Sequence, residues 1–434
     1  MKIVLGVAGT AGDLNPFVAL ALELKRRGHE PVIATQDDFR QIIEDEGLGF
    51  HPVRPSVSEV MAELGLDAPD IIQRASRGST GLEFAVRRIA MRFLRRAYGD
   101  MRRATADADL VITHTSAFAA RLAAETRGLP WISTALSPFT FMSAHEPPVL
   151  SGLAIARRLR DLTQGRSDAV IVKLARGLTG AWTREFQRLR RELGLPPCPN
   201  PLFDGQFSPY GTLGLFSPRF GAMQPDFPQP CALTGFCFYD HRHGVPATLS
   251  EEMAAFLRAG EAPIIFTLGS TLVMKPGHFY EVGLAAAHQL GRRAILLTGP
   301  DSGLLARPPT PNVLVADYAP HSELFPHALA IVHHGGVGTT AQALRAGKPQ
   351  LIIPFSADQP DNGERVARLG VGRAVPHRRL GVQTMRGELE ALLAGDYVAA
   401  AGGFAASIAG ENGPAAAADV IETALAGGAL RRHA

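Results

Sequence analysis

The sequence opens with MKIVLGVAGTAGDLNPFVALALELKRRGHEPVIAT, residues 1–35, and this stretch decides the fold. Residues 2–8 form a short apolar run rich in Val and Ile, which predicts a buried parallel strand. A glycine-rich turn follows, and Pro16 suits the first turn of a helix, where its missing N–H costs nothing. Apolar residues then recur at helical spacing up to Gly28, and residues 31–35 form a second strand. This βαβ unit predicts a doubly wound α/β sheet.

The alternation of strand and helix returns along the rest of the chain. Further strands are expected at 110–113, 131–135, 264–268, 294–298, 313–316, 331–333 and 350–353, and helices at 117–126, 279–290 and 415–425. Residues 206–240 are dense in Pro, Gly and Phe, which is typical of a linker. We therefore expect an N-terminal domain at 1–205, a linker at 206–240, a second domain at 241–414 and a C-terminal helix and tail at 415–434.

Composition excludes several classes of protein. The 434 residues are 46% hydrophobic and 20% charged, as in a globular protein, and the net charge of +3 gives no indication of nucleic-acid binding. The three cysteines, Cys198, Cys231 and Cys237, form no CxxC motif, which argues against a disulfide framework or a zinc ribbon and fits a reducing cytosol. The N-terminus lacks the pattern of a secretory signal, and no stretch reaches the length of a spanning helix. We expect a soluble protein, at most peripheral to a membrane.

Two segments are rich in arginine. Residues 74–103 and 157–191 both resemble amphipathic helices with interleaved apolar residues. The simpler interpretation is a solvated cationic face. The alternative is contact with an anionic lipid surface or with an amphiphilic acceptor.

The stretch 331–363, IVHHGGVGTTAQALRAGKPQLIIPFSADQPDNG, is the most informative for function. Glycines at a strand-to-helix turn let backbone N–H groups approach an anion, and the helix N-terminus adds a partial positive charge. The turn therefore predicts a phosphate site with a histidine at its mouth. Asp358 and Gln359 follow the next strand, so they would line the same crevice. A carboxylate and an amide together can hold the vicinal hydroxyls of a sugar.

These residues resemble the nucleotide-sugar glycosyltransferases of the GT-B fold, which include plant secondary-product, bacterial natural-product and sterol enzymes. The shared elements are DYAPHSELFP (317–326), HHGGVGTT (333–340) and PxxxDQ with Asn362 (354–362). Segments 9–29, 136–149 and 228–236 also match, and they are most similar to the rhamnolipid-forming rhamnosyltransferases. The resemblance covers essentially the whole chain. It implies two Rossmann-like domains facing a cleft, the first binding acceptor and the second donor, with a C-terminal helix that crosses back to the first domain.

The resemblance also assigns donor-binding residues. Tyr318 takes the place of a Trp that stacks on the nucleobase, His321 that of a base-contacting Gln, and His334 that of the diphosphate-binding His, whereas the role of His333 is left open. The implied donor-binding residues are Ser270, Tyr318, Ala319, His321, His334, Gly336, Val337, Gly338, Thr339, Asp358 and Gln359.

Two departures from the family pattern bear on chemistry. Gln342 stands where the family often has a Glu that grips both ribose hydroxyls, which favours a deoxyribose donor, dTDP over UDP. Asp13 stands where many members have a His that acts as general base, so Asp13 is the expected base. The alternative for Asp13 is a cap for the helix near Pro16. His114 and His145 are candidates for auxiliary base or acceptor contacts.

The implied reaction is inverting transfer of a hexose or deoxyhexose from a dTDP or UDP sugar to a hydroxyl of a hydrophobic acceptor. The acceptor classes are a hydroxy fatty acid, a sterol or a polyketide aglycone. Neither a cofactor nor a metal is expected: the DxD at Asp107–Asp109 precedes its strand, whereas a metal-binding pair would follow one. The expected location is the cytoplasm, with the inner-membrane surface as an alternative. A nucleotide-sugar epimerase or hydrolase and a non-catalytic donor-binding auxiliary protein are rival functions.

Overall fold

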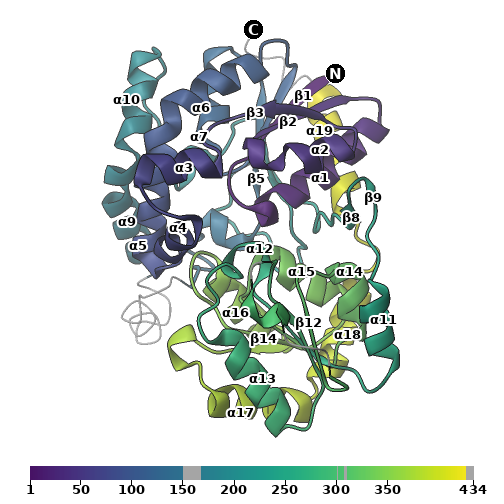
Figure 1. Ribbon diagram of the computed structural model, residues 1–434. Coiled ribbons are helices and arrows are strands. Elements are labelled where there is room, and N and C mark those ends of the chain that lie inside the picture. Colours follow the sequence, from purple (N-terminus) through teal and green to yellow (C-terminus); the bar gives the residue numbers. More distant parts are fainter. Residues whose placement is uncertain (150–167, 301, 307–309, 427–434) are drawn as a thin grey trace. The chain divides into compact units, whose positions relative to one another are not determined.

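The computed structural model describes residues 1–149, 168–300, 302–306 and 310–426 (Figure 1). The chain divides into two compact units. Unit 1 comprises Met1–Asp67, Ser79–Tyr239 and Glu411–Ala434, and unit 2 comprises Ala68–Gly78 and Asp240–Gly410.

Unit 1 is built on a parallel sheet in the order β3-β2-β1-β4-β5-β6-β7. Its strands are β1 (Lys2–Gly6), β2 (Glu30–Thr35), β3 (Gly49–Pro52), β4 (Leu110–Thr113), β5 (Trp131–Ala135), β6 (Thr212–Gly214) and β7 (Cys231–Leu233). Its helices are α1 (Ala11–Arg26), α2 (Arg40–Asp45), α3 (Val57–Leu64), α5 (Gly78–Phe84), α6 (Met91–Ala104), α7 (Phe118–Thr126), α9 (Asp168–Thr179), α10 (Arg184–Glu192) and α19 (Gly413–Ala426). The strand order reverses between β1 and β4, which is where doubly wound sheets bind ligands.

Unit 2 repeats this architecture with the order β12-β11-β10-β13-β14-β15. Its strands are β10 (Ile264–Thr267), β11 (Ala294–Leu297), β12 (Val313–Ala316), β13 (Ala330–His333), β14 (Gln350–Ile352) and β15 (Gly372–Ala374). Its helices are α4 (Ala68–Ala75), α11 (Glu251–Arg258), α12 (Gly269–Leu272), α13 (Phe279–Gln289), α14 (His321–Leu324), α15 (Val337–Arg345), α16 (Gln359–Arg368), α17 (Val382–Ala394) and α18 (Tyr397–Ile408). A separate hairpin pairs β8 (His241–Arg242) with β9 (Val245–Pro246). Here the order reverses between β10 and β13.

The two doubly wound sheets confirm the fold class. The expected strands lie within one or two residues of their predicted bounds, because buried apolar runs form the central strands: Ile3, Val4, Leu5, Ile264, Ile265 and Phe266 are all 0% exposed. The return of the C-terminal helix is also confirmed, since α19 packs against α1 within unit 1 (Figure 1). Arg27 donates to Asp419 at 2.6 Å and to Glu422 at 2.8 Å and so fastens α19 to the end of α1.

The structure corrects three expectations. Residues 212–214 and 231–233 of the expected linker are instead strands of the first sheet, too short to show an apolar periodicity. Residues 68–78, expected in the N-terminal domain, belong to unit 2, where Ile72 packs on the core and Asp70 pairs with Lys275 at 2.9 Å. Helix α1 begins at Ala11, so Pro16 lies inside it rather than in its first turn.

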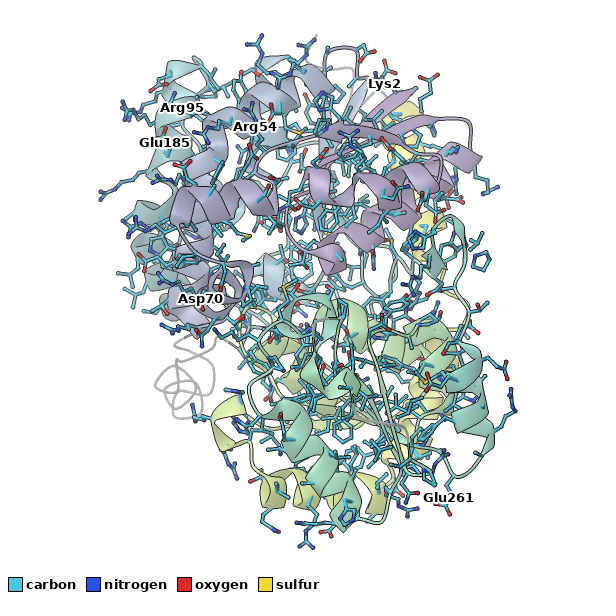
Figure 2. All side chains as sticks on the ribbon, viewed as in Figure 1. Lys2, Arg54, Asp70, Arg95, Glu185 and Glu261 are labelled. Carbon is cyan, nitrogen blue, oxygen red and sulfur yellow. The ribbon has the colours of Figure 1, made fainter. Side chains whose placement is uncertain are left out.

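The arginine-rich segments use many of their charges within unit 1. The segment 74–103 is divided into α4, α5, a π-helical turn at Ala85–Ala90 and α6. On α6, Arg95 pairs with Glu185 of α10 at 2.7 Å (Figure 2). Arg95 also pairs with Glu192 of the same helix at 2.7 Å. Arg92 pairs with Glu63 of α3 at 2.6 Å. These ion pairs tie the helices to one another; residues 157–167 lie outside the described part of the chain.

Candidate functional site

The predicted phosphate turn connects β13 to α15 in unit 2. Gly335 has a φ of +89°, and Gly336 is the N-cap of α15, which begins at Val337. No side chain caps this helix, and its first turn carries no acidic residue. The first N–H groups of a helix have no partner inside the helix, and its dipole favours an anion there. The turn is therefore built as expected for a site that receives phosphate oxygens.

His334 lies between two glycines beside this turn. A Cβ atom at Gly336 would be 2.4 Å from His334 Nε2, and one at Gly269 would be 2.7 Å from Cε1, so only glycine admits the imidazole. His334 Nδ1 is buried and has no hydrogen-bond partner among the described residues. Burial lowers the pKa of His334 to about 3, with smaller contributions from the neighbouring His333 and His321. The ring is therefore neutral near pH 7 and can offer an anion one N–H donor rather than a charge.

His333, whose role the sequence leaves open, is structural. Its Nε2 lies 2.9 Å from Gln350 Oε1, and its Nδ1 accepts the Gly335 N–H at 3.1 Å. Because Nδ1 accepts, Nε2 carries the proton and donates to the amide oxygen. His333 is 0% exposed, and burial lowers its pKa to about 4. Through these two hydrogen bonds, His333 holds the backbone of the glycine turn to the neighbouring strand β14.

The other predicted phosphate-binding residues surround the same strand ends. Ser270 is exposed in α12, directly after β10, and β10 pairs with β13. Val337 and Gly338 form the first turn of α15. Thr339, the third residue of α15, is buried at 8% exposure.

Asp358 and Gln359 begin α16 and are both tied to the local backbone. Gln359 Oε1 accepts from the N–H groups of Phe355 at 2.9 Å and Ser356 at 3.1 Å, which leaves its Nε2 as the group that can face a ligand. Asn362 Nδ2 donates to Asp358 Oδ2 at 2.8 Å and to Gly335 O at 2.9 Å. One buried amide thus joins the phosphate turn to the predicted sugar-binding carboxylate, a role that the sequence did not reveal.

Three predicted donor-binding residues follow β12, and two of them, Tyr318 and His321, are the predicted nucleobase contacts. Tyr318 is 45% exposed, with the Arg242 guanidinium 4.5 Å from the centre of its ring. His321 stacks on Phe325 with a centroid distance of 4.3 Å, and burial lowers its pKa to about 4. Ala319 is 3% exposed and lies in the hydrophobic core, so only its backbone could meet a ligand.

In unit 1, Asp13 lies in the first turn of α1, next to the end of β1. Its Oδ2 accepts from the Thr10 N–H at 2.7 Å and from Thr10 Oγ1 at 3.0 Å. Gly9 has a φ of +140°, and a Cβ there would lie 2.2 Å from Oδ2, so glycine makes room for the carboxylate. Asp13 therefore stabilises the helix start from the third helical position, whereas the N-cap that the alternative interpretation assigned to Asp13 is Thr10. Its Oδ1 remains available to another partner.

His114 follows β4, the neighbour of β1, and it meets Asp13. His114 Nε2 lies 3.6 Å from Asp13 Oδ1, and its Nδ1 lies 2.9 Å from Ala8 O and 2.7 Å from Ser116 Oγ. Because a carbonyl oxygen only accepts, Nδ1 carries the proton and Nε2 is an acceptor. Burial lowers the pKa of His114, and the nearby Asp13 charge opposes this. The neutral imidazole and the carboxylate thus present two acceptor atoms, His114 Nε2 and Asp13 Oδ1, close to each other. A hydroxyl proton could be bound there.

The remaining candidates are not part of this pair. His145 is exposed on the loop after residues 138–141, and its backbone N–H donates to Ser143 Oγ at 3.0 Å. The DxD aspartates both bind Lys2, Asp107 through Nζ at 2.7 Å and Asp109 through the backbone N–H at 2.8 Å. In the part of the chain that the structure describes, no group of three or more His, Cys, Asp or Glu residues could hold a metal ion. Among the described residues, no single helix is long and apolar enough to cross a membrane. One pair of helical segments joined at a bend, 382–394 and 397–425, is long and apolar enough by length and composition alone.

The sequence is similar to those of several known proteins. Residues 3–145 match the glycosyltransferase family 28 N-terminal domain, and residues 294–423 match the erythromycin biosynthesis protein CIII-like C-terminal domain. The chain is 32% identical to an O-mycaminosyltylonolide 6-deoxyallosyltransferase of Streptomyces fradiae over 88% of this chain and 87% of that one. It is 27% identical to a sterol 3-beta-glucosyltransferase of Arabidopsis thaliana over 98% of this chain and 68% of that one.

Solved structures agree on the fold. The glycosyltransferase of kitacinnamycin superposes with a TM-score of 0.69 and 23% identity, over 98% of this chain and 99% of its own. A spinosyn rhamnosyltransferase gives a TM-score of 0.69 at 18% identity, over 97% and 100%. The protein therefore belongs to the nucleotide-sugar glycosyltransferases of the GT-B fold, with a family 28 N-terminal domain.

Proposed function

We propose that the protein transfers a 6-deoxyhexose from a dTDP sugar, with inversion, to a hydroxyl group of a hydrophobic polyketide or sterol acceptor. The observation that carries the donor half is the uncapped first turn of α15 beside the His334 ring, whose buried Nδ1 has no partner among the described residues. A diphosphate would supply the acceptor that both lack. Its developing charge as leaving group would be met by N–H donors that are already oriented.

The chemical step uses the pair in unit 1. The acceptor hydroxyl donates its proton to Asp13 Oδ1 while its oxygen attacks the anomeric carbon from the face opposite the diphosphate. The bond between the anomeric carbon and the diphosphate oxygen breaks, and its electron pair leaves with the diphosphate. His114 Nε2, 3.6 Å from Oδ1, is a second acceptor for the same proton, so it draws the hydroxyl proton toward the carboxylate. No residue of this scheme requires a metal or a cofactor, so we expect turnover to persist in a chelator.

The nature of the donor is supported by one relative and one residue. The relative at 32% identity is named as a 6-deoxyallosyltransferase, whereas the sterol enzymes at 27–28% identity are glucosyltransferases. Gln342 replaces the Glu that grips two ribose hydroxyls in many relatives, which favours a nucleoside with one hydroxyl. Together these favour dTDP over UDP and a deoxyhexose over glucose.

The nature of the acceptor is supported by the same relatives. One acts on a tylonolide, by its name, and others act on sterols, and both compounds are bulky and apolar with a reactive hydroxyl. A hydroxy fatty acid is the third class to test. We place the reaction in the cytoplasm, with the surface of the inner membrane as the source of the most apolar acceptors.

The test has two stages. A panel of nucleotide sugars is first screened by thermal shift, because a ligand that binds only the folded protein raises its melting temperature. Release of nucleoside diphosphate from the best donor is then measured with and without each acceptor. Release that requires an acceptor supports a transferase, whereas release without one indicates a hydrolase. Binding without any release would indicate an auxiliary protein and would contradict the proposal.

A further inference from the structure

Asp240 lies at the centre of a polar cluster in unit 2 that no predicted site includes. It directly precedes the β8–β9 hairpin, and its backbone oxygen accepts from Ala247 N–H at 3.0 Å, which closes the hairpin. Its carboxylate receives both arms of Arg345, at 2.7 Å on Oδ2 and 2.9 Å on Oδ1. Gln342 Nε2 donates to the same Oδ1 at 2.9 Å. The cluster joins the hairpin to the exposed side of α15.

These bonds fix the orientation of Gln342. Its Oε1 accepts from Arg345 Nη2 at 2.7 Å while its Nε2 points at the carboxylate, and the opposite orientation would set two acceptors against each other. Both ends of the amide are therefore engaged by protein groups. Gln342, which stands in the place of a hydroxyl-binding Glu, is held by Asp240. Its amide in turn holds the Asp240 carboxylate.

The predicted nucleobase residues lie near the same carboxylate. Arg242, two residues along, covers the ring of Tyr318 at 4.5 Å. Helix α14, which carries His321, packs against α15. The charge of Asp240 acts on both side chains: it adds to the rise that burial causes in the pKa of Tyr318, and it opposes the fall that burial causes in the pKa of His321. The carboxylate thus lies within electrostatic reach of both expected base contacts.

We propose that Asp240 binds the sugar hydroxyl of the donor's nucleoside, with Gln342 and Arg345 as its positioning residues. The Asp240 side chain is 33% exposed, so a ligand can reach it. Among the described residues Oδ1 accepts two hydrogen bonds and Oδ2 one, so Oδ2 retains a lone pair. One acceptor site suits one hydroxyl, the 3′-OH of thymidine. This inference rests on the proposed function and assigns the residue that reads the nucleoside.

The experiment measures binding by calorimetry for three probes: dTDP, the diphosphate of 3′-deoxythymidine, and inorganic pyrophosphate. For the native protein we expect removal of the 3′-OH to weaken binding by about 10-fold or more, the usual effect of losing a hydrogen bond to a charged group. In Asp240→Asn we expect dTDP to bind at least 10-fold more weakly, the 3′-deoxy compound to bind almost as tightly as dTDP, and pyrophosphate to be unaffected. The matched control is Asp396→Asn, an exposed acid of unit 2 that makes no side-chain cap bond.

The ligand comparison separates this role from a structural one. If Asp240 only holds the hairpin on α15, Asp240→Asn will weaken dTDP, its 3′-deoxy analogue and pyrophosphate by similar factors, and the inference is overturned. If dTDP binds the native protein no better than pyrophosphate does, the proposed donor is wrong, which is a different failure. A native protein that prefers dTDP but tolerates loss of the 3′-OH would overturn the inference and leave the proposed function standing.

Discussion

Asp13 has two roles that one substitution can separate. Asn at this position keeps an oxygen that accepts from the Thr10 N–H, so α1 should still begin at Ala11. It removes the basic carboxylate, and we expect Asp13→Asn to lower kcat by about 10²–10⁴-fold while dTDP affinity stays unchanged. Steady-state kinetics with calorimetry check this. Glu30→Gln, at an exposed position of β2, serves as control, and an unimpaired kcat in Asp13→Asn would remove Asp13 as the base.

The imidazole of His334 depends on a glycine that the sequence alone does not single out. Gly269 has a φ of +67° and faces His334 Cε1, whereas Gly277 has a φ of +57° and nothing within 4 Å. Both changes to Ala strain the backbone by about 1 kcal/mol, but only Gly269→Ala pushes the ring. We expect dTDP affinity to fall about 10-fold in Gly269→Ala and to stay unchanged in Gly277→Ala, as measured by calorimetry. Equal losses in both variants would show that backbone strain, not the ring, is responsible.

The sequence predicts the residues of the turn better than their roles. Gly336 and His334 were identified because glycines, histidine and a helix start coincide in one motif. The sequence does not predict the different roles of His333 and His334. Only the fold decides which ring contacts Gln350 and which ring lies between Gly269 and Gly336. Asp240 belongs to no sequence motif. Its position in the cluster depends on contacts with residues about one hundred positions away.

At the scale of elements, Arg27, the residue that follows α1, helps to hold helix α19 in place. Arg27, 16% exposed, holds Asp419, Glu422 and the Ala415 carbonyl, whereas Arg26, 69% exposed, pairs with Glu23. We expect Arg27→Ala to lower the free energy of unfolding by about 1–3 kcal/mol and Arg26→Ala to lower it much less, because the Arg26 side chain is largely exposed. Urea unfolding measures both values. Hydrogen exchange should show faster exchange in α19 for Arg27→Ala only, and equal protection in the two variants would contradict the assignment.

Elements were predictable where a buried apolar run decides the structure. Strand β4 has the predicted bounds, since all four of its residues are buried. Helix α1 begins earlier than expected because Asp13 reaches back to the Thr10 N–H, a contact that needs both residues in place. The strands β6 and β7 have three residues each, too few for any periodicity, and they exist because β5 offers an edge to pair with.

At the scale of the whole molecule, the buried histidines of unit 2 make stability depend on pH. Folding lowers the pKa of His321 and His333 from 6.5 to about 4 and that of His334 to about 3. Between those values and 6.5 the unfolded chain binds protons that the folded chain excludes, so this stability is present above pH 6.5 and is lost as the pH falls. Each proton contributes about 1.4 kcal/mol per pH unit.

We therefore expect urea unfolding between pH 7 and pH 5 to be coupled to uptake of one to three protons, with the protein less stable at pH 5. His333→Gln should remove about one proton from this slope, because its ring is fully buried. Saturating dTDP should flatten the slope, since an anion at the tip of α15 raises the pKa of His334 toward its unfolded value. Stability that stays level, or rises, as the pH falls to 5 would mean that these rings are charged in the folded protein, and the neutral donor assigned to His334 would be wrong.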